Sequence, residues 1–271
     1  MNIADNEISI ITVIYNQSDF IKYQYLLLKK FMKNKFRYYC YNNADNDIVR
    51  ENINRICIEL GITSINIPQN IFDNNNNPSY RAGLSLDHAI KHNVDEYGSK
   101  YMIILDSDMF LIDYLDLNEI QGDFVGIKQY REGIEYYNNQ LSYLNLTNLP
   151  NFENEVKFLP GIINGINTDC GGYLYNYFMN NKQIIHKEFV HIICSQSMSI
   201  VNILESNIPD TDTYNFFINE FDIFEDGKNF SELYDKKFLH FRAGSNWINF
   251  SNEIVKKRTE NLYSFLDKKI E

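Results

Sequence analysis

The four cysteines of this 271-residue chain are scattered, and no two of them form a Cys-x-x-Cys pair. Their spacing excludes a cysteine zinc module and a dense disulfide framework. Long apolar runs are also lacking, and none approaches the roughly 18 residues of a membrane-spanning helix. Residues 1–7 lack the basic-then-apolar order of a signal peptide, so we expect a soluble, cytoplasmic protein. The expected reduced thiols are Cys40, Cys57, Cys170 and Cys194.

An excess of basic residues is missing as well, since the formal net charge is −11. A long nucleic acid is therefore not an expected partner, although a small polyanion held through a metal is compatible with this charge. The hydrophobic share of 44% is that of a globular chain. We expect one domain over residues 1–271.

Strand-like and helix-like segments alternate in the first half of the chain. This alternation predicts an α/β fold with a Rossmann-like, mostly parallel central sheet flanked by helices. The second half is less regular, and we expect an irregular aromatic stretch over residues 130–158 and a Gly-rich segment over residues 161–172. The predicted strands are 8–15, 36–41, 62–67, 101–105, 123–129 and 238–241, and the predicted helices are 18–33, 47–60, 78–97 and 195–204.

Two carboxylates, Asp106 and Asp108, follow the apolar strand that ends at Leu105, with Ser107 between them. Ligands of open parallel sheets bind beyond the carboxyl ends of the strands, so this is where a site is expected. Two like charges in an apolar stretch are costly unless a cation or hydrogen bonds compensate. Mg²⁺ or Mn²⁺ is a cation that such oxygen ligands hold, and either metal can bridge them to a diphosphate. A turn or a helix cap is the alternative explanation.

This arrangement of strand, Asp-Ser-Asp and apolar strand resembles the Asp-x-Asp signature of glycosyltransferases with the single-domain GT-A fold. Near the carboxyl terminus, the segment from Phe238 to Trp247 is similar to the His-containing segment of retaining enzymes of the glycogenin and bacterial galactosyltransferase type. The resemblance implies His240 as a third metal ligand, and Gly244 and Asn246 as donor contacts. The family has a Lys after its Gly, whereas this chain has Ser245 and Asn246, so Arg242 is the candidate for the missing charge.

Three further segments resemble the same family more loosely. Arg81 opens the helix before the Asp106 strand, where the family has an Arg that contacts the donor; a surface Arg is the alternative. The segment 167–174 resembles the Asn/Gly strand beneath the donor sugar, where Gly171 and Gly172 would allow a close backbone approach; a bulge is the alternative. The segment Ser195-Gln196-Ser197 resembles the Asp-Gln-Asp segment that the family has beside the reacting face of the sugar, but only Gln196 matches. A helix cap by Ser195 is the alternative.

For the nucleoside end, Tyr15 and Asn16 follow the first predicted strand, and Asp45 follows the second. An aromatic face and amide groups at the carboxyl edge of the sheet can stack on a base and hydrogen-bond to it. The candidates for a general base are Asp169, Glu220 and Asp222. Among the aromatic residues of the second half we expect mostly core, with a sugar-stacking wall as the alternative: Tyr130, Tyr136, Tyr137, Tyr143 and Phe152.

The resemblance implies a Mn²⁺- or Mg²⁺-dependent hexosyltransferase that moves a sugar from a nucleoside-diphosphate donor to the hydroxyl of a carbohydrate, glycan or protein. It also implies a UDP-linked donor and retention of configuration. The implied division of the domain is a nucleotide-sugar-binding half over about residues 1–129 and an acceptor-binding, catalytic half over about residues 130–271. An inverting enzyme of the same fold, a sugar nucleotidyltransferase and a non-catalytic sugar-binding module are the alternatives. Residues 12–18 lack the Gly-rich, basic phosphate loop of a nucleotidyltransferase. A binding module would keep its ligand when Asp108 is lost.

Overall fold

The computed structural model describes residues 7–72, 77–194, 208–224, 230–242 and 250–271. The chain forms two compact units. The first unit consists of Met1–Ile21, Asn34–Ser107 and Asp116–Phe189, and the second consists of Lys22–Lys33, Asp108–Leu115 and Val190–Glu271. The predicted helix at 195–204 lies outside the described residues, and the functional division near residue 129 stays a prediction.

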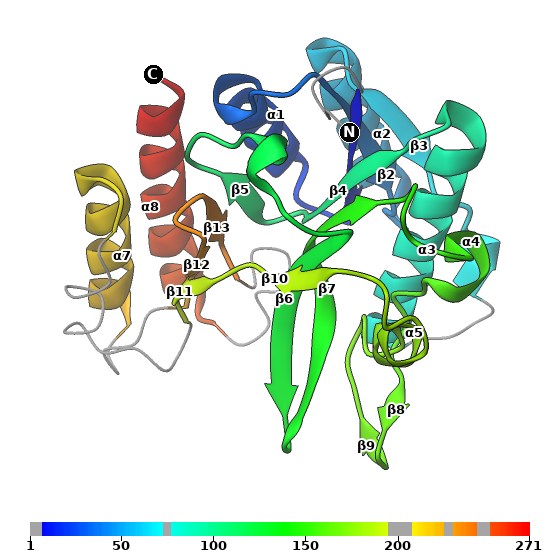
Figure 1. Cartoon of the computed structure of the whole chain (residues 1–271). Coiled ribbons are helices and arrows are strands. Elements are labelled where there is room, and N and C mark those ends of the chain that lie inside the picture. The colour runs from blue at the N-terminus through cyan, green and yellow to red at the C-terminus, as the bar shows by residue number, and fades with distance from the viewer. Residues whose placement is uncertain (1–6, 73–76, 195–207, 225–229, 243–249) are drawn as a thin grey trace. The chain divides into compact units, whose positions relative to one another are not determined.

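A seven-stranded sheet forms the centre of the first unit, in the order β10-β6-β7-β4-β1-β2-β3 (Figure 1). Strands β1, β2, β3 and β4 are mutually parallel, and β10 is parallel to β6. Only β7 runs against both of its neighbours, β4 and β6. The predicted mostly parallel α/β sheet is confirmed. The strand bounds are β1 Ile8–Ile14, β2 Phe36–Asn42, β3 Thr63–Asn66, β4 Tyr101–Asp106, β6 Phe124–Arg131, β7 Ile134–Asn145 and β10 His186–Glu188.

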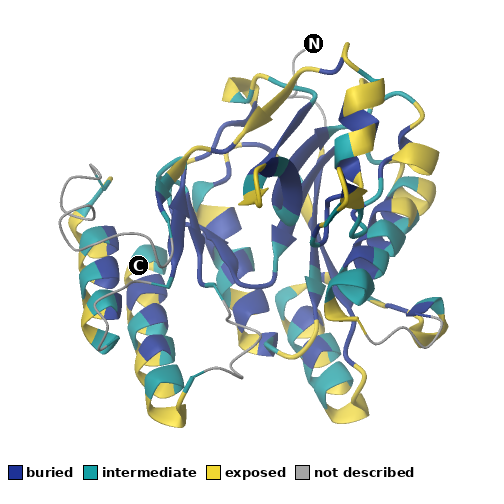
Figure 2. Ribbon diagram, turned by 90° about the horizontal axis from the view of Figure 1, so that it is seen from below, coloured by how far each residue is buried: buried dark blue, intermediate teal, exposed yellow. Residues whose placement is uncertain are grey.

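The core of this unit lies on both faces of its parallel strands. Every residue of β4 up to Leu105 is buried, and β1 is buried almost throughout. Helices on both faces require continuous apolar strands, which explains why these segments could be recognised from near-unbroken β-branched runs. Figure 2 shows buried residues on the strands, and helices that are buried along one side and exposed along the other.

Polar caps and glycines delimit the helices that the sequence predicted. Asn46 accepts hydrogen bonds from the amides of Ile48 and Val49 at the start of α2, and Asn77 caps α3 through Tyr80. Gly61 and Gly98 end these two helices in the left-handed conformation. The helical segments that begin in this unit are α1 Ser18–Phe31, α2 Asp47–Leu60, η2 Gln69–Phe72, α3 Pro78–Tyr97, η3 Leu117–Glu119, α4 Phe152–Glu155 and α5 Leu174–Asn180.

The prediction of an irregular stretch over residues 130–158 is wrong, because Ile134–Asn145 form strand β7. The strand lies between β6 and β4 in the sheet: residues 134–137 pair with β6, and residues 141–145 pair with β4. The sequence does not predict this strand because the polar run in its middle consists of poor strand formers, Asn138, Asn139 and Gln140. The strand tolerates them there because Asn138 hydrogen-bonds to the amide and the side chain of Gln140.

The second unit contains a four-stranded antiparallel sheet in the order β11-β12-β13-β5, with helices α7 and α8 packed on each other. The carboxyl-terminal part of α1 also belongs to it, and Gln24 donates its side-chain amide to the Met109 carbonyl. Of the strands, only β13 and β5 were expected from the sequence. The bounds are β5 Met109–Leu111, β11 His191–Ile193, β12 Glu232–Tyr234, β13 Phe238–His240, α7 Thr211–Ile223 and α8 Asn252–Ile270.

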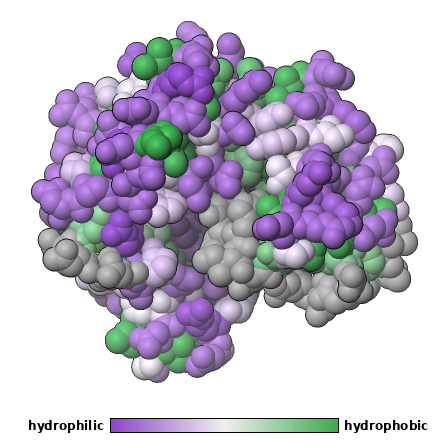
Figure 3. Space-filling view, turned by 180° about the vertical axis from the view of Figure 1, so that it is seen from behind, coloured by the Kyte–Doolittle hydropathy of each residue, from purple (hydrophilic) through white to green (hydrophobic). Residues whose placement is uncertain are grey.

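The surface in Figure 3 is largely hydrophilic, and its hydrophobic residues are scattered in small patches. Scattered apolar side chains of this kind are ordinary on a protein surface. Over the described part of the chain, no helix combines the length and the apolar character needed to cross a bilayer.

Candidate metal centre and nucleotide-binding edge

Asp106 and Asp108 flank a turn that connects β4 to β5. Asp106 is the last residue of β4, and its carboxylate accepts a hydrogen bond of 2.7 Å from the Ser107 amide. Ser107 and Asp108 are 5% and 3% exposed. The turn therefore keeps a carboxylate in a buried position at the carboxyl end of a central strand, as the sequence predicted.

His240 ends β13, which lies between β12 and β5 in the sheet of the second unit. The Phe241 amide donates to the Asp108 carbonyl at 2.9 Å, which fixes the backbone of the turn to the end of β13. Nε2 of His240 lies 3.4 Å from Oδ1 of Asp108. Asp106, two residues earlier in the chain, completes a group of three whose ligand atoms all lie within 4.8 Å of one another.

Glu232 on β12 is a member of this site that the sequence did not suggest. Its Oε2 accepts hydrogen bonds from Nδ1 of His240 and from the Tyr234 hydroxyl, both at 2.8 Å. The only signal in the sequence is an acid directly before Leu233 and Tyr234, and a three-residue strand is too short to show a period. Glu232 belongs to the site because β12 pairs with β13, which places Glu232 opposite His240.

The buried carboxylates control the charge of His240. Burial by itself lowers the pKa of the imidazole, but the charge of Asp108, and the hydrogen bonds to Asp108 and Glu232, raise that pKa to about 10. Burial alone would raise the pKa of Glu232, whereas its hydrogen bond to His240 and the neighbouring charges hold it well below the usual range. The site therefore favours positive charge between Asp108 and Glu232.

The donor set fits a hard or borderline divalent cation. Two carboxylates and one imidazole nitrogen are ligands that Mn²⁺ accepts, and Zn²⁺ binds similar sets. The second ring nitrogen of His240 donates to a carboxylate, which is the usual arrangement behind a metal-bound histidine. Asp106, Asp108 and His240 are therefore the residues that would hold a metal.

The carboxyl ends of β1 and β2 bring together the residues predicted for the nucleoside. The Tyr15 hydroxyl donates to Asp45 at 2.8 Å, and this bond raises the pKa of Tyr15. Arg81 is close enough to Tyr15 to oppose that rise. Tyr15 is 43% exposed, so its ring is accessible at this edge. Asn16 is also exposed there, and Val13 is in register with Asp106 on the neighbouring strand.

Arg81 is held in place by an aromatic ring. Its guanidinium lies 4.1 Å from the centre of the Phe72 ring and 3.4 Å from the side-chain oxygen of Gln69. An arginine that stacks on a ring still offers its edge nitrogens to an anion. The position at the start of α3 agrees with the predicted donor contact, and that role stays a prediction.

Asp169 is fixed to the start of α3. The Ser79 hydroxyl donates to the Asp169 carboxylate and accepts a hydrogen bond from the Cys170 amide at 2.9 Å. The Asp169 amide in turn donates to the Tyr136 hydroxyl at 3.1 Å. A carboxylate with these contacts is well positioned, and whether it acts as a base stays a prediction.

Gly171 and Gly172 are needed by the packing of the protein itself. Gly171 has a φ of +93°, and a Cβ there would lie 2.3 Å from the Tyr137 carbonyl oxygen. A Cβ at Gly172 would collide with the Thr168 side chain. The two residues form the turn before α5 and do not form a strand bulge; the strands that precede them in the chain are β8 Ile162–Ile163 and β9 Ile166–Asn167.

The remaining predicted site residues are two candidates for the general base and three residues that the structure does not describe. Glu220 is fully buried and paired with Arg258 at 2.8 Å, so its carboxylate has a structural partner and is not available as a base; Asp222 is exposed on α7. Gln196, Gly244 and Asn246 lie outside the described residues.

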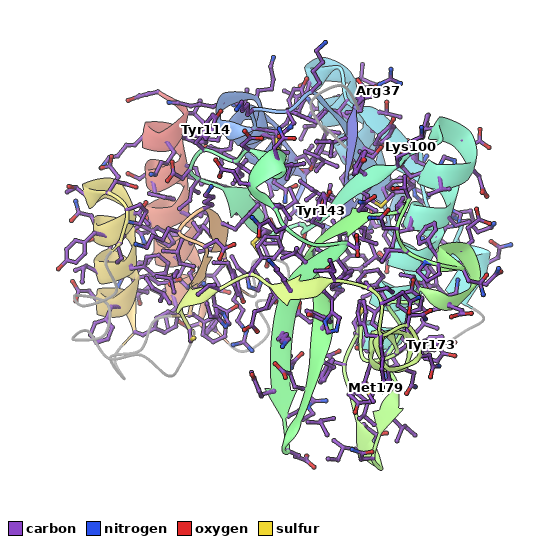
Figure 4. All side chains as sticks on the ribbon, viewed as in Figure 1. Arg37, Lys100, Tyr114, Tyr143, Tyr173 and Met179 are labelled. Atoms are coloured by element: carbon purple, nitrogen blue, oxygen red, sulfur yellow. The ribbon has the colours of Figure 1, made fainter. Side chains whose placement is uncertain are left out.

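Most of the aromatic residues considered for a sugar-stacking wall belong to the core, as expected. Tyr136, Tyr137, Tyr143 and Phe152 are buried, and Figure 4 labels Tyr143 on β7. Tyr130 differs, since it is 74% exposed near the tip of the β6–β7 hairpin. A wall made of all five side chains is therefore excluded.

Comparison with known proteins leaves the site as the main guide to function. A scan against known protein families finds no match, and no curated protein matches the sequence.

Proposed function

We propose that this protein is a metal-dependent glycosyltransferase that transfers a sugar from a nucleoside-diphosphate donor to an acceptor hydroxyl. The observation that carries the proposal is the group formed by Asp106, Asp108 and His240 at the carboxyl end of a central parallel strand. The mostly parallel sheet supports it, because such sheets bind nucleotides at this edge.

The residues have distinct roles in this proposal. A divalent cation bound by Asp106, Asp108 and His240 would neutralise the charge that develops on the leaving diphosphate. Tyr15, Asn16 and Asp45 would hold the base and ribose, and Arg81 would contact a phosphate. A UDP-linked donor, a hexose and retention of configuration follow only from the resemblance in the sequence.

Calorimetric titration of UDP into the purified protein, with Mn²⁺ and again with a chelator, tests the proposal. We expect binding that requires Mn²⁺. Binding that is equal in both conditions would keep a nucleotide site but remove the metal from it. If UDP fails to bind, GDP and other nucleoside diphosphates are titrated in the same way, and failure of all of them contradicts the proposal.

Asp108→Asn isolates the metal site within the same assay. The variant keeps the size of the side chain but loses a charged ligand, so Mn²⁺-dependent UDP binding and hydrolysis of the donor sugar should fall by more than about 100-fold. Asp212→Asn, at a half-exposed position of α7, is the matched control and should bind as the wild type does. Wild-type activity in Asp108→Asn would dismiss the proposed metal site.

A further inference from the structure

Glu232 and His240 are direct cross-strand neighbours in the second unit. The antiparallel register of β12 and β13 pairs Glu232 with His240 and Tyr234 with Phe238. Residues that face each other in this way have side chains on the same side of the sheet, within contact distance. Strand β5 pairs with the other edge of β13 and brings in Asp108, the residue before Met109. His240 is thus enclosed between two carboxylates, Glu232 on β12 and Asp108 directly before β5.

The two ring nitrogens of His240 face different partners. Nδ1 lies 2.8 Å from Oε2 of Glu232, and Nε2 lies 3.4 Å from Oδ1 of Asp108. A carboxylate only accepts hydrogen bonds, so Nδ1 carries the proton in the contact with Glu232. Nε2 is then the nitrogen that is left to bind a cation beside Asp108.

The Glu232 carboxylate is itself held in place. Tyr234, two residues along the same strand and therefore on the same face, donates its hydroxyl to Oε2. The other oxygen, Oε1, has Nε2 of His191 and Nη1 of Arg242 at 3.8 Å each. The His191 ring stacks on Tyr234 with 4.2 Å between centres. Glu232 is 7% exposed, so its orientation is set by these neighbours.

We propose that Glu232 is a positioning residue of the metal centre: its carboxylate orients the His240 ring and fixes the proton on Nδ1, so that Nε2 is presented to the cation. This inference rests on the proposed metal site. Glu232 does not touch the metal or the donor in this arrangement. It acts through His240, and Tyr234 acts through Glu232.

Titration of the full-length protein with MnCl₂, without nucleotide, tests this role. Removal of a carboxylate behind a metal-bound histidine weakens metal binding by about 10–100-fold. We expect Glu232→Gln to raise the dissociation constant for Mn²⁺ within that range, and Tyr234→Phe to raise it less. Glu253→Gln, at an exposed position of α8, is the matched control and should bind Mn²⁺ as the wild type does.

Metal affinity separates positioning from a merely structural role, provided that circular dichroism shows each variant folded at the temperature used. Wild-type Mn²⁺ affinity in a folded Glu232→Gln protein would overturn the inference. If that variant does not fold, Glu232→Asp replaces it, because the shorter side chain keeps the charge but withdraws it from Nδ1, and the same loss is expected. If neither the wild type nor His240→Gln binds Mn²⁺, the proposed metal site itself fails, which is a different result.

Discussion

Asp87 on α3 shows how one buried carboxylate makes stability depend on pH. Its side chain accepts a hydrogen bond from the Phe158 amide at 2.8 Å. Burial raises the pKa of Asp87 to about 6, although the Phe158 amide and Lys157 act in the opposite direction. The folded state therefore binds the proton of Asp87 more tightly than the unfolded chain, in which the carboxyl has its ordinary pKa.

The sign of the resulting effect follows from proton linkage. Between about pH 4 and pH 6 the folded state holds more protons, so the contribution of Asp87 to stability falls as the pH rises. The full loss is at most about 3 kcal/mol, because each pKa unit corresponds to about 1.4 kcal/mol. Asp87→Asn should be more stable than the wild type at pH 7.5 and similar to it at pH 4. Urea unfolding at both pH values measures this, and a parallel pH dependence of the two proteins would contradict it.

Some residues of the candidate site can be predicted from the sequence, and others cannot. Asp106 and Asp108 could be predicted, because two carboxylates stand out after a buried apolar strand. Glu232 could not, because its role depends on the residue opposite it on β13, eight positions later in the chain. A contact between strands is set by register, and three-residue strands carry no period from which register can be predicted.

At the scale of elements, two turns depend on glycine for different reasons: the β8–β9 turn with Gly165 and the turn before α5 with Gly171. Gly165 and Gly171 both have a positive φ, +82° and +93°. A Cβ on Gly165 would meet nothing within 4 Å, whereas one on Gly171 would lie 2.3 Å from the Tyr137 carbonyl oxygen. Replacement of Gly165 therefore tests the backbone conformation alone, and replacement of Gly171 adds a steric clash.

We expect Gly165→Ala to lower the free energy of unfolding by about 1–2 kcal/mol, the cost of a left-handed non-glycine residue. Gly171→Ala should cost clearly more and should also disturb the adjacent Asp169. Denaturant unfolding of both variants measures the difference. Equal losses would mean that the β7 backbone shifts at little cost in free energy to accommodate the added methyl group.

Helices α7 and α8 are joined by a buried ion pair. Arg258 and Glu220 are both fully buried, and Ser231 donates to the same carboxylate through its amide and hydroxyl. Arg258 also donates to the Arg242 carbonyl at 3.2 Å, two residues after His240. Its guanidinium lies close to the rings of Phe224, Phe230, Phe241 and Phe250. The pair therefore supports the backbone that follows His240.

Breaking this pair should be costly, because it leaves an uncompensated buried charge. Arg258→Met should reduce the free energy of unfolding by about 3–5 kcal/mol. The double variant Arg258→Met with Glu220→Gln should recover part of that loss, since the remaining charge is gone. Urea unfolding of the two single variants and the double variant gives the coupling. A double variant that is as unstable as the sum of both single variants would show that the pair contributes nothing of its own.

At the scale of the whole molecule, the two units are interleaved along the chain. Each consists of three segments, so the chain passes between the units five times. One of these passages lies between Ser107 and Asp108, inside the Asp-x-Asp group. A cation bound by Asp106, Asp108 and His240 would bind the folded chain only, because the unfolded chain does not hold these ligands together. Stability of the whole protein should therefore respond to the metal.

Mn²⁺ at about 100 times its dissociation constant should stabilise the folded protein by about 2.7 kcal/mol. That energy corresponds to a rise of roughly 5–10 °C in the melting temperature of a chain of this size. Because the net charge is −11, any divalent cation also screens repulsion. Sr²⁺ at equal concentration is the control, and it should stabilise less. Equal stabilisation by both cations, or none, would argue against a specific site.

The sequence by itself determined the alternating strands and helices of the first unit and the position of the Asp-x-Asp turn. Both depend on local signals: buried parallel strands need apolar runs, and helices begin and end at polar caps and glycines. Tertiary structure decided the rest. Strand β7 forms despite its polar run because the residues before the run pair with β6 and those after it pair with β4 and β6, and Glu232 reaches His240 because β12 pairs with β13. Glu220 has a structural partner in Arg258, thirty-eight residues away. These contacts join residues that are distant in the chain, and only the folded backbone brings their side chains together.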